Sequence, residues 1–211
     1  LLAPTAVAHA TVIARQAAVI CGQAWFEACF RALDSNVEIN WCVAEGELVA
    51  ANAVLCELRG QARAVVTAER SGLNFLQTLS ATATCVRQFV QAIEGTRAKI
   101  MDTRKTLPGL RMAQKYAVRV GGGHNQRAGL FDGVLIKENH ILAAGGIAAV
   151  LAQVKAQIPS HIPVQIEVES LDELAQALSA GASLILLDNM DNKQLIEAVA
   201  LAGEQAQLEA S

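Results

Sequence analysis

The sequence predicts an α/β protein, and three observations lead to this prediction. Residues 1 to about 66 mix short apolar runs of strand type and helix type, as in an α+β segment. A long helical stripe then runs to Gly95. After Gly95, strands and helices alternate, which is typical of a parallel sheet or a βα barrel.

The first segment is expected to hold one short helix among several strands. The run Ala10–Cys21 is apolar and rich in β-branched residues, which favours a strand, although the same run is also compatible with a helix. Gln23–Leu33 has the pattern of a short helix, and strands are expected near Val37–Val43 and Val49–Leu58.

The long helix is expected to begin at Thr67, whose hydroxyl would cap its first turn. Its apolar residues recur at intervals of three and four, so they share one face, and Gly95 would end the helix. The stripe consists of Leu73, Leu76, Leu79, Ala83, Val86, Val90 and Ile93.

The second half of the chain alternates short strands with helices. The predicted strands are Ala98–Met101, Ala117–Val120, Val134–Ile136, Val164–Val168 and Leu184–Leu187. Helices are expected near Leu110–Tyr116, over Ile147–Ile158 and over Leu171–Ser179, the last opened by a capping box of Ser170 and Glu173. Five strands are fewer than the eight of a regular barrel, and the chain does not begin with methionine. We therefore expect the sequence to be part of a longer protein.

Composition excludes several classes of protein. The chain is 53% apolar and 18% charged with a net charge of −3, which argues against a disordered tail and against a globally basic nucleic-acid binder. No apolar run reaches the length of about 20 residues that spans a bilayer, and no export signal opens the chain. The five cysteines show no C-x-x-C spacing, so reduced, buried thiols of a cytoplasmic protein are expected.

Positive charge is concentrated in one stretch. Between Arg97 and His140 there are nine Lys or Arg and three Asp or Glu residues, whereas the rest of the chain has eight and seventeen. This local excess predicts a site for a small anion, and the scarcity of aromatic residues there disfavours a nucleic-acid surface. A solvated charged face would instead suit Lys99, Arg111 and Lys115.

Charged residues also follow the predicted strands of the second half, where α/β proteins place their chemistry. Within Val164–Val168 the polar Gln165 and Glu167 alternate with apolar residues, so a polar face is expected at the barrel mouth. The carboxylates could bind a divalent ion with phosphate oxygens, or sugar hydroxyls, or form a salt bridge to Arg104 or Lys105 without a ligand. The set at the strand ends is Arg104, Lys105, Arg127, Lys137, Glu167 and Asp188.

Other features carry less information. Gly121–Gly123 would let the backbone approach a ligand closely or would form a simple turn. His9 and His140 are expected to be structural, and His161 is expected to face solvent. The sequence has no Walker loop, no G-x-G-x-x-G, no Ser-His-Asp arrangement and no Cys/His cluster with metal-ligand spacing.

Six ordered motifs resemble those of the quinolinate phosphoribosyltransferase family over nearly the whole chain. They are Ala68-Glu-Arg-Ser-Gly-Leu-Asn-Phe75, Asp102-Thr-Arg-Lys-Thr-Leu-Pro-Gly-Leu-Arg111, Val120-Gly-Gly-Gly-His-Asn-Gln-Arg127, Leu135-Ile-Lys-Glu-Asn-His140, Ile166-Glu-Val-Glu169 and Leu186-Leu-Asp-Asn189. The resemblance implies an N-terminal α/β sandwich over residues 1–75, running into a long helix to residue 94. An incomplete TIM-like α/β barrel over residues 96–211 would follow, with N-terminal residues and the last barrel strands missing.

The resemblance also implies an activity and roles for residues. Phosphoribosyl would pass from phosphoribosyl pyrophosphate to quinolinate with decarboxylation, giving nicotinate mononucleotide with Mg²⁺ and no organic cofactor. Glu167 and Asp188 would bind ribose hydroxyls and Mg²⁺ and act in catalysis with Lys105. A homodimer is implied, in which Arg70 enters the neighbouring site. The residues implied to hold quinolinate are Arg70, Thr103, Arg104, Lys105, Gln126, Arg127 and Lys137.

Two departures from the family pattern leave alternatives open. The family usually has histidine where this chain has Gln126, and glutamine cannot carry its charge. His124 would compensate for that loss or have no role. The glycine-rich phosphate loops of the family follow the Glu-Ala-Ser at which this sequence stops. A paralogue associated with molybdenum transport and a non-catalytic assembly partner are the alternative functions.

Overall fold

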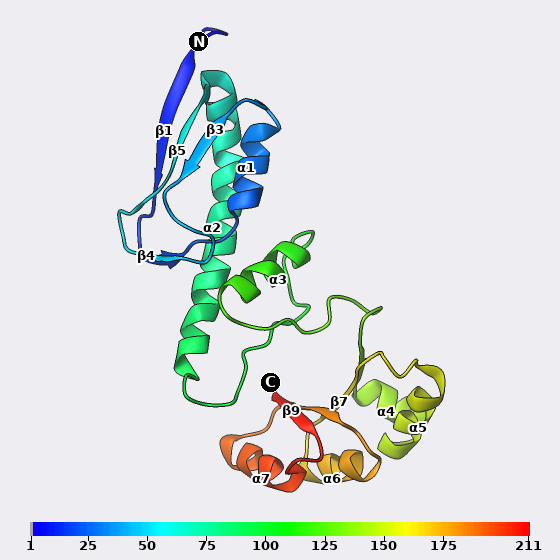
Figure 1. The fold of residues 1–211 in the computed structure, drawn as a ribbon. Coiled ribbons are helices and arrows are strands. Elements are labelled where there is room, and N and C mark those ends of the chain that lie inside the picture. The colour runs from blue at the N-terminus through cyan, green and yellow to red at the C-terminus, as the bar shows by residue number, and fades with distance from the viewer. Residues whose placement is uncertain (1) are drawn as a thin grey trace. The chain divides into compact units, whose positions relative to one another are not determined.

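Residues 2–211 are described by a computed structural model, in which the chain divides into two units (Figure 1). The first unit ends at Gln126, and the second comprises Arg127–Ser211. No helix of the described residues has the length and apolar character needed to cross a membrane.

The first unit is built on a three-stranded antiparallel sheet in the order β1 (Val7–Ile13), β5 (Val54–Gln61) and β3 (Glu38–Trp41). Two short strands, β2 (Ala18–Val19) and β4 (Leu48–Val49), pair separately. The predicted strands over 10–21 and 49–58 are therefore each interrupted. The two segments stay hydrogen-bonded to each other at the interruption, since the Asn52 N–H donates to the Ala14 carbonyl at 2.7 Å.

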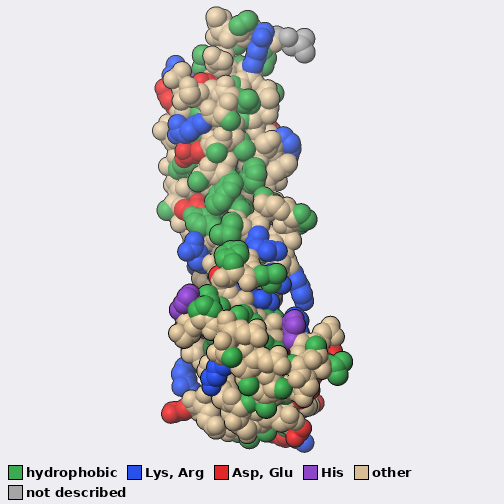
Figure 2. Space-filling model, turned by 90° about the vertical axis from the view of Figure 1, so that its right-hand side faces the viewer, with side chains coloured by type: hydrophobic (Ala, Val, Ile, Leu, Met, Phe, Trp, Pro, Cys, Tyr) green, Lys and Arg blue, Asp and Glu red, His purple; other side chains and the backbone are tan. Residues whose placement is uncertain are grey.

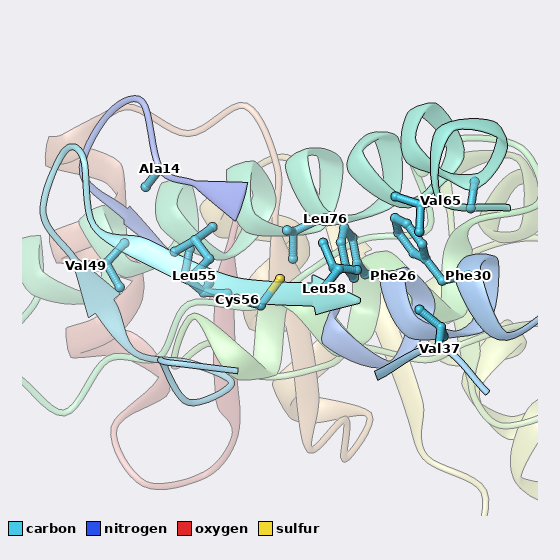
Figure 3. Packing of buried hydrophobic residues seen from close by; sticks show 12 residues of the cluster. Ala14, Phe26, Phe30, Val37, Val49, Leu55, Cys56, Leu58, Val65 and Leu76 are labelled. Carbon is cyan, nitrogen blue, oxygen red and sulfur yellow. The ribbon is translucent and has the colours of Figure 1, made fainter. Parts of the chain in front are cut away.

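Helices α1 (Gln23–Arg31) and α2 (Ala62–Ala92) lie on one side of this sheet (Figure 1). Figure 3 shows Phe26 and Phe30 of α1 beside Leu58 of β5 in the core between them. The two helices approach closely at Gly72, where a Cβ atom would lie 2.8 Å from the Phe30 ring. The sandwich core thus depends on a glycine inside a helix.

Helix α2 begins earlier than the sequence predicts. Gln61 is its N-cap residue, and the Thr67 hydroxyl donates to the Arg63 carbonyl at 2.7 Å from inside the helix. Thr67 is therefore not the cap. The predicted apolar stripe is confirmed in its middle, since Leu76, Leu79 and Ala83 are at most 3% exposed. Its end is not, because the helix ends at Ala92, before Ile93 and Gly95.

The next element, α3 (Arg111–Val120), packs against α2 and replaces a predicted strand. Its Ala113 and Ala117 share one face and are buried against α2, so the run 117–120 continues a helix and does not begin a strand. The predicted strand over 98–101 is also wrong, because that segment forms only a single parallel bridge, from Met101 to His124.

The second unit contains a parallel four-stranded sheet with helices between its strands. The order is β6-β7-β8-β9, as the barrel-like pattern requires. The strands are β6 (Val134–Ile136), β7 (Val164–Val168), β8 (Leu184–Leu187) and β9 (Gln207–Ala210). The helices are α4 (Glu138–Ala144), α5 (Ile147–Gln157), α6 (Leu171–Ser179) and α7 (Asn192–Ala202).

One face of this sheet packs on helices and forms the second core. Ile166 and Val168 of β7 are fully buried with Leu174 of α6 and Ala198 of α7. The predicted cap of α6 is half confirmed. Ser170 Oγ accepts from the Glu173 N–H at 3.2 Å, but the Glu173 carboxylate accepts from the Glu169 N–H in place of that of Ser170.

The cysteines are all unpaired, and only some are buried. Cys21 and Cys56 are buried, and burial raises the pKa of the Cys56 thiol to about 12. Burial and the neighbouring Glu45 carboxylate raise the pKa of Cys21 as well. Cys42 and Cys85 are exposed, so the expectation of five buried thiols is wrong for these two.

Candidate active site

The polar face of the second unit's sheet is centred on Glu167. Since Ile166 and Val168 point into the core, Gln165 and Glu167 lie on the opposite face of β7. Lys137, directly after β6, places its Nζ 2.7 Å from Glu167 Oε2 and 3.1 Å from Oε1. A salt bridge to Arg104 or Lys105 was one alternative for the carboxylates, and Glu167 pairs with Lys137 instead, because parallel neighbouring strands bring these two ends together.

The main chain of Lys137 is fixed by the start of α4. Its N–H donates to His140 Nδ1 at 3.0 Å, which agrees with the structural role predicted for His140. Half of the Lys137 side chain is exposed, whereas only 11% of that of Glu167 is. The ammonium is therefore accessible to an anion while the carboxylate beneath it is held in place.

Asp188 follows β8, the next strand. Its N–H donates to the Val168 carbonyl at 3.0 Å, which continues the ladder from β7 by one residue. Its carboxylate accepts from Asn189 Nδ2 at 3.2 Å, and Asn189 has a left-handed φ of 56°. The turn at Asn189 ends the strand and leaves Asp188 half-buried at the edge where β7 and β8 end.

Sequence reasoning missed a third carboxylate on this sheet, Glu209. Glu209 pairs in register with Leu186 of β8, and Leu186 pairs with Glu167 of β7. The side chains of Glu167, Leu186 and Glu209 therefore share one face of the sheet. Glu209 Oε2 accepts from Gln165 Nε2 at 2.9 Å. The available signal was the alternation of Leu208 and Glu209, but a single large apolar residue is too little to predict a strand.

Arg127 opens a loop that precedes β6. One of its guanidinium nitrogens donates to the Gly133 carbonyl at 3.4 Å, and its side chain packs beside Gly133. The Asp132 carboxylate accepts from the N–H groups of Ala128 and Gly129 at 2.8 and 2.9 Å. The loop is closed on itself, so the stem of Arg127 has a defined direction.

A cleft of about 190 Å³ lies beside Glu167 in the second unit. It is lined by Glu138, Ile141, Leu142, Glu167, Glu169 and Glu173. Four carboxylates and two apolar side chains are a poor environment for a phosphorylated or dicarboxylate ligand. This cleft is therefore a poor candidate for an anion site.

In the first unit, the predicted cations lie in the ordered loop after Asp102. Thr103 Oγ1 accepts from the Lys105 N–H at 3.0 Å, which fixes a tight turn. The Arg104 carbonyl accepts from an Arg111 guanidinium nitrogen at 3.2 Å. Thr103 and Lys105 are exposed, so their side chains are available for a ligand.

Two further predicted residues belong to the same unit. Arg70 is exposed on α2, eight residues into the helix. Gln126 is fixed through its backbone, since its N–H donates to Asp102 Oδ1 at 2.7 Å and its carbonyl accepts from Lys115 Nζ at 2.9 Å. Lys115 is 3% exposed, which corrects the expectation that it lies on a solvated face.

Positive charge is distributed in small groups on the surface. On the face drawn in Figure 2, Lys and Arg side chains are interspersed with acidic and apolar ones. This pattern suits small anions better than a continuous polyanion.

Comparison with known proteins places these residues in a family. The family model described as the quinolinate phosphoribosyl transferase C-terminal domain matches residues 82–211, and that of the N-terminal domain matches residues 1–80. The chain belongs to the quinolinate phosphoribosyltransferase family. The two family domains meet within α2, which links the sandwich to the barrel-like part.

Several members of the quinolinate phosphoribosyltransferase family are similar over most of this chain. A probable nicotinate-nucleotide pyrophosphorylase (carboxylating) of Bacillus subtilis is 39% identical over 86% of the chain and 63% of its own length. One of Synechocystis is 37% identical over 90% of the chain and 64% of its length. The chain therefore spans a little under two thirds of these curated relatives.

Solved structures of the family show the same fold. The nicotinate-nucleotide pyrophosphorylase of Francisella tularensis is 45% identical, with a TM-score of 0.94 over 98% of this chain and 73% of that one. NadC from Streptococcus pyogenes is 37% identical, with a TM-score of 0.95 over 100% of this chain and 74% of that one. The predicted fold class, an α/β sandwich followed by an incomplete TIM-like barrel, is confirmed.

Proposed function

We propose that the full-length protein transfers phosphoribosyl from phosphoribosyl pyrophosphate to quinolinate and removes one carboxylate, giving nicotinate mononucleotide, pyrophosphate and carbon dioxide. This reaction supplies NAD biosynthesis, and we place it in the cytoplasm. The observation that carries the proposal is the family match over both domains, together with relatives named for this reaction.

Quinolinate would be held by cations of the first unit, of the loop before β6 and of the end of β6. It is a planar dicarboxylate, and guanidinium groups bind carboxylates in a bidentate manner. Lys137 differs from the other cations because its ammonium is bound to Glu167 on one side, while half of its side chain is exposed. A substrate carboxylate would add a second anion on its open side. The proposed quinolinate-binding set is Arg70, Thr103, Arg104, Lys105, Gln126, Arg127 and Lys137.

Glu167 and Asp188 would bind the ribose of the donor. As pyrophosphate leaves, positive charge develops at the anomeric carbon, and the two carboxylates would stabilise it. The quinolinate nitrogen takes over that bond and becomes cationic. The electron pair left when the adjacent carboxylate departs as carbon dioxide stays on the ring carbon, where the neighbouring cationic nitrogen stabilises it. A proton then adds to that carbon, so no organic cofactor is required.

Mg²⁺ would enter with the donor. The described residues contain no group of three or more His, Cys, Asp or Glu side chains able to hold a metal alone. Mg²⁺ prefers one or two carboxylates together with phosphate oxygens and water. Glu167 and Asp188 would supply the protein's oxygens, and the ion would neutralise charge on the pyrophosphate.

The active assembly would be a homodimer. Arg70 is exposed on α2, whereas the other proposed cations lie in loops after residue 102. We propose that Arg70 completes the quinolinate site of the neighbouring subunit.

The test uses the full-length protein with quinolinate, phosphoribosyl pyrophosphate and Mg²⁺. We expect stoichiometric nicotinate mononucleotide and carbon dioxide, and quinolinate affinity that falls as salt is raised. Nicotinate, which has one carboxylate, is the matched control ligand and should bind far more weakly. Equal affinity for the two acids would remove quinolinate as the substrate, and no turnover with intact binding would favour a non-catalytic protein.

A further inference from the structure

Lys115 and Asp102 form a buried ion pair that the proposed reaction does not use. Lys115 Nζ lies 2.5 Å from Asp102 Oδ1, and the two side chains are 4% and 6% exposed. Removing two charges from water costs several kcal/mol per ion unless further hydrogen bonds compensate. A buried ion pair of this kind can specify one conformation of the chain segments that it joins. The hydrogen bonds around the pair show which segments these are.

The pair joins two chain segments that carry proposed substrate residues. Asp102 Oδ1 accepts from the Gln126 N–H at 2.7 Å, and Lys115 Nζ donates to the Gln126 carbonyl at 2.9 Å. Asn125 Nδ2 donates to Asp102 Oδ2 at 2.6 Å. The Gln126 N–H is thereby bound to Asp102, which directly precedes Thr103, and the Gln126 carbonyl is bound to Lys115, the partner of Asp102 in the ion pair.

The same face of α3 holds the rest of the loop. Arg111 donates to the Arg104 carbonyl at 3.2 Å and to Thr106 Oγ1 at 3.3 Å. Gln114 Oε1 accepts from the Leu107 N–H at 2.8 Å. With Lys115, these residues are spaced by three and four, so one helix face contacts the loop along its length.

We propose that Lys115 is a positioning residue of the quinolinate pocket, acting through Asp102 to hold the Thr103–Lys105 loop and Gln126 at a fixed separation. The inference rests on the proposed function, since it assumes that these segments bind quinolinate. A displacement of about 1 Å in a binding group is enough to cost a large factor in affinity or rate. Lys115 would thus affect the substrate without contacting it.

The experiment compares two variants of the full-length protein. In Lys115→Met/Asp102→Asn both charges are removed and side-chain size is kept, so folding should be preserved. The matched control is Arg87→Met, which removes guanidinium bonds to the carbonyls of Gly121 and Val120 at the other end of α3. Calorimetric Kd for quinolinate, thermal stability and amide hydrogen exchange are measured for each.

In the double variant we expect the quinolinate Kd to rise about tenfold or more. Amide exchange should also speed up in residues 102–107 and 124–126. The Arg87→Met protein should keep its Kd within about twofold at a similar loss of melting temperature. If the double variant does not fold, Arg111→Met, which removes the contacts to Arg104 and Thr106, should show the same rise in Kd.

Two failures are distinguishable. A wild-type protein that does not bind quinolinate overturns the proposed function. If the wild-type protein binds quinolinate but the double variant has an unchanged Kd and unchanged amide exchange, the role of Lys115 is overturned. The same holds if the changes in the double variant are no larger than those of the Arg87→Met control at the same loss of melting temperature.

Discussion

At the scale of single residues, the structure separates charges that hold the chain from charges that remain available. Lys115 and Asp102 are buried and mutually bound, whereas Lys105 and Arg70 are exposed. Lys137 is intermediate, since it is bound to Glu167 and still half exposed. Only the available charges can respond to a ligand without loss of the fold.

The carboxylates of Glu167 and Asp188 are expected to act through charge. In the full-length protein, Glu167→Gln and Asp188→Asn keep side-chain shape and should each lower kcat about a hundredfold or more, roughly 3 kcal/mol of transition-state stabilisation. Quinolinate Kd should change much less. The measurement is steady-state turnover with calorimetric binding, and near-normal kcat in both variants would show that the pair is structural.

Thiol reactivity is expected to follow burial. A raised pKa lowers the thiolate fraction at a given pH, so Cys21 and Cys56 should resist iodoacetamide at pH 8 in the native protein. The exposed Cys42 and Cys85 should be modified first. Mass spectrometry of peptides checks this, with labelling in denaturant as the control. Rapid native labelling of Cys56 would contradict the buried position.

At the scale of elements, the most constrained contact is that between α1 and α2. Glycine inside a helix is normally unfavourable by about 1 kcal/mol relative to alanine. At Gly72 the rings of Phe26 and Phe30 occupy the space that a side chain would need. Packing therefore outweighs helix propensity at this position.

Gly72→Ala is accordingly expected to destabilise the protein. The new Cβ would lie 2.8 Å from the Phe30 ring, and overpacking of this kind costs about 1–3 kcal/mol. The measurement is chemical denaturation of the purified protein. Ser71→Ala, at an exposed position of the same helix, is the matched control and should change stability by less than about 0.5 kcal/mol. A stabilised Gly72→Ala protein would show that the helices can separate without cost.

The elements that could be predicted from sequence are those with a strong periodic pattern. The stripe of α2 and the apolar strands β7 and β8 appear as predicted. The strand predicted over Ala117–Val120 is wrong, because a run of four residues with three apolar ones fits a strand and a helix end equally well, and only packing on α2 decides between them. Strand β9 was missed because half of its four residues are polar.

At the scale of the whole molecule, each of the two units carries part of the set of predicted site residues. Lys137, Glu167 and Asp188 lie at the carboxyl ends of β6, β7 and β8, as the order of parallel strands along the chain predicts. Arg104, Lys105 and Arg127 do not follow strands, because the strands expected over 98–101 and 117–120 are absent from the described residues. The partners of the carboxylates could not be predicted. The contacts of Glu167 with Lys137 and of Glu209 with Gln165 depend on the register of the sheet. Lys115 was misjudged because a lysine in a helix does not reveal its burial.

The dimer is tested by exchange of subunits in the full-length protein. Arg70→Ala and Lys105→Ala homodimers should each be nearly inactive. A mixture that has exchanged subunits should regain activity, because one site per heterodimer is then intact. Turnover after mild dissociation and reassociation measures the recovery, and unmixed variants treated alike are the control. No recovery would mean that each site is built within one chain.

The way in which Gln126 is held has a consequence for how this site can change over generations. Two hydrogen bonds that hold its position come from its main chain, which every amino acid except proline shares. These two bonds do not depend on the chemistry of the side chain. A lineage can exchange the histidine usual in this family for glutamine, and so alter proton and charge supply at the proposed quinolinate site, while these two main-chain bonds are kept. We therefore expect that substitutions which change ligand preference are accepted at position 126 before they are accepted at Asp102 or Lys115.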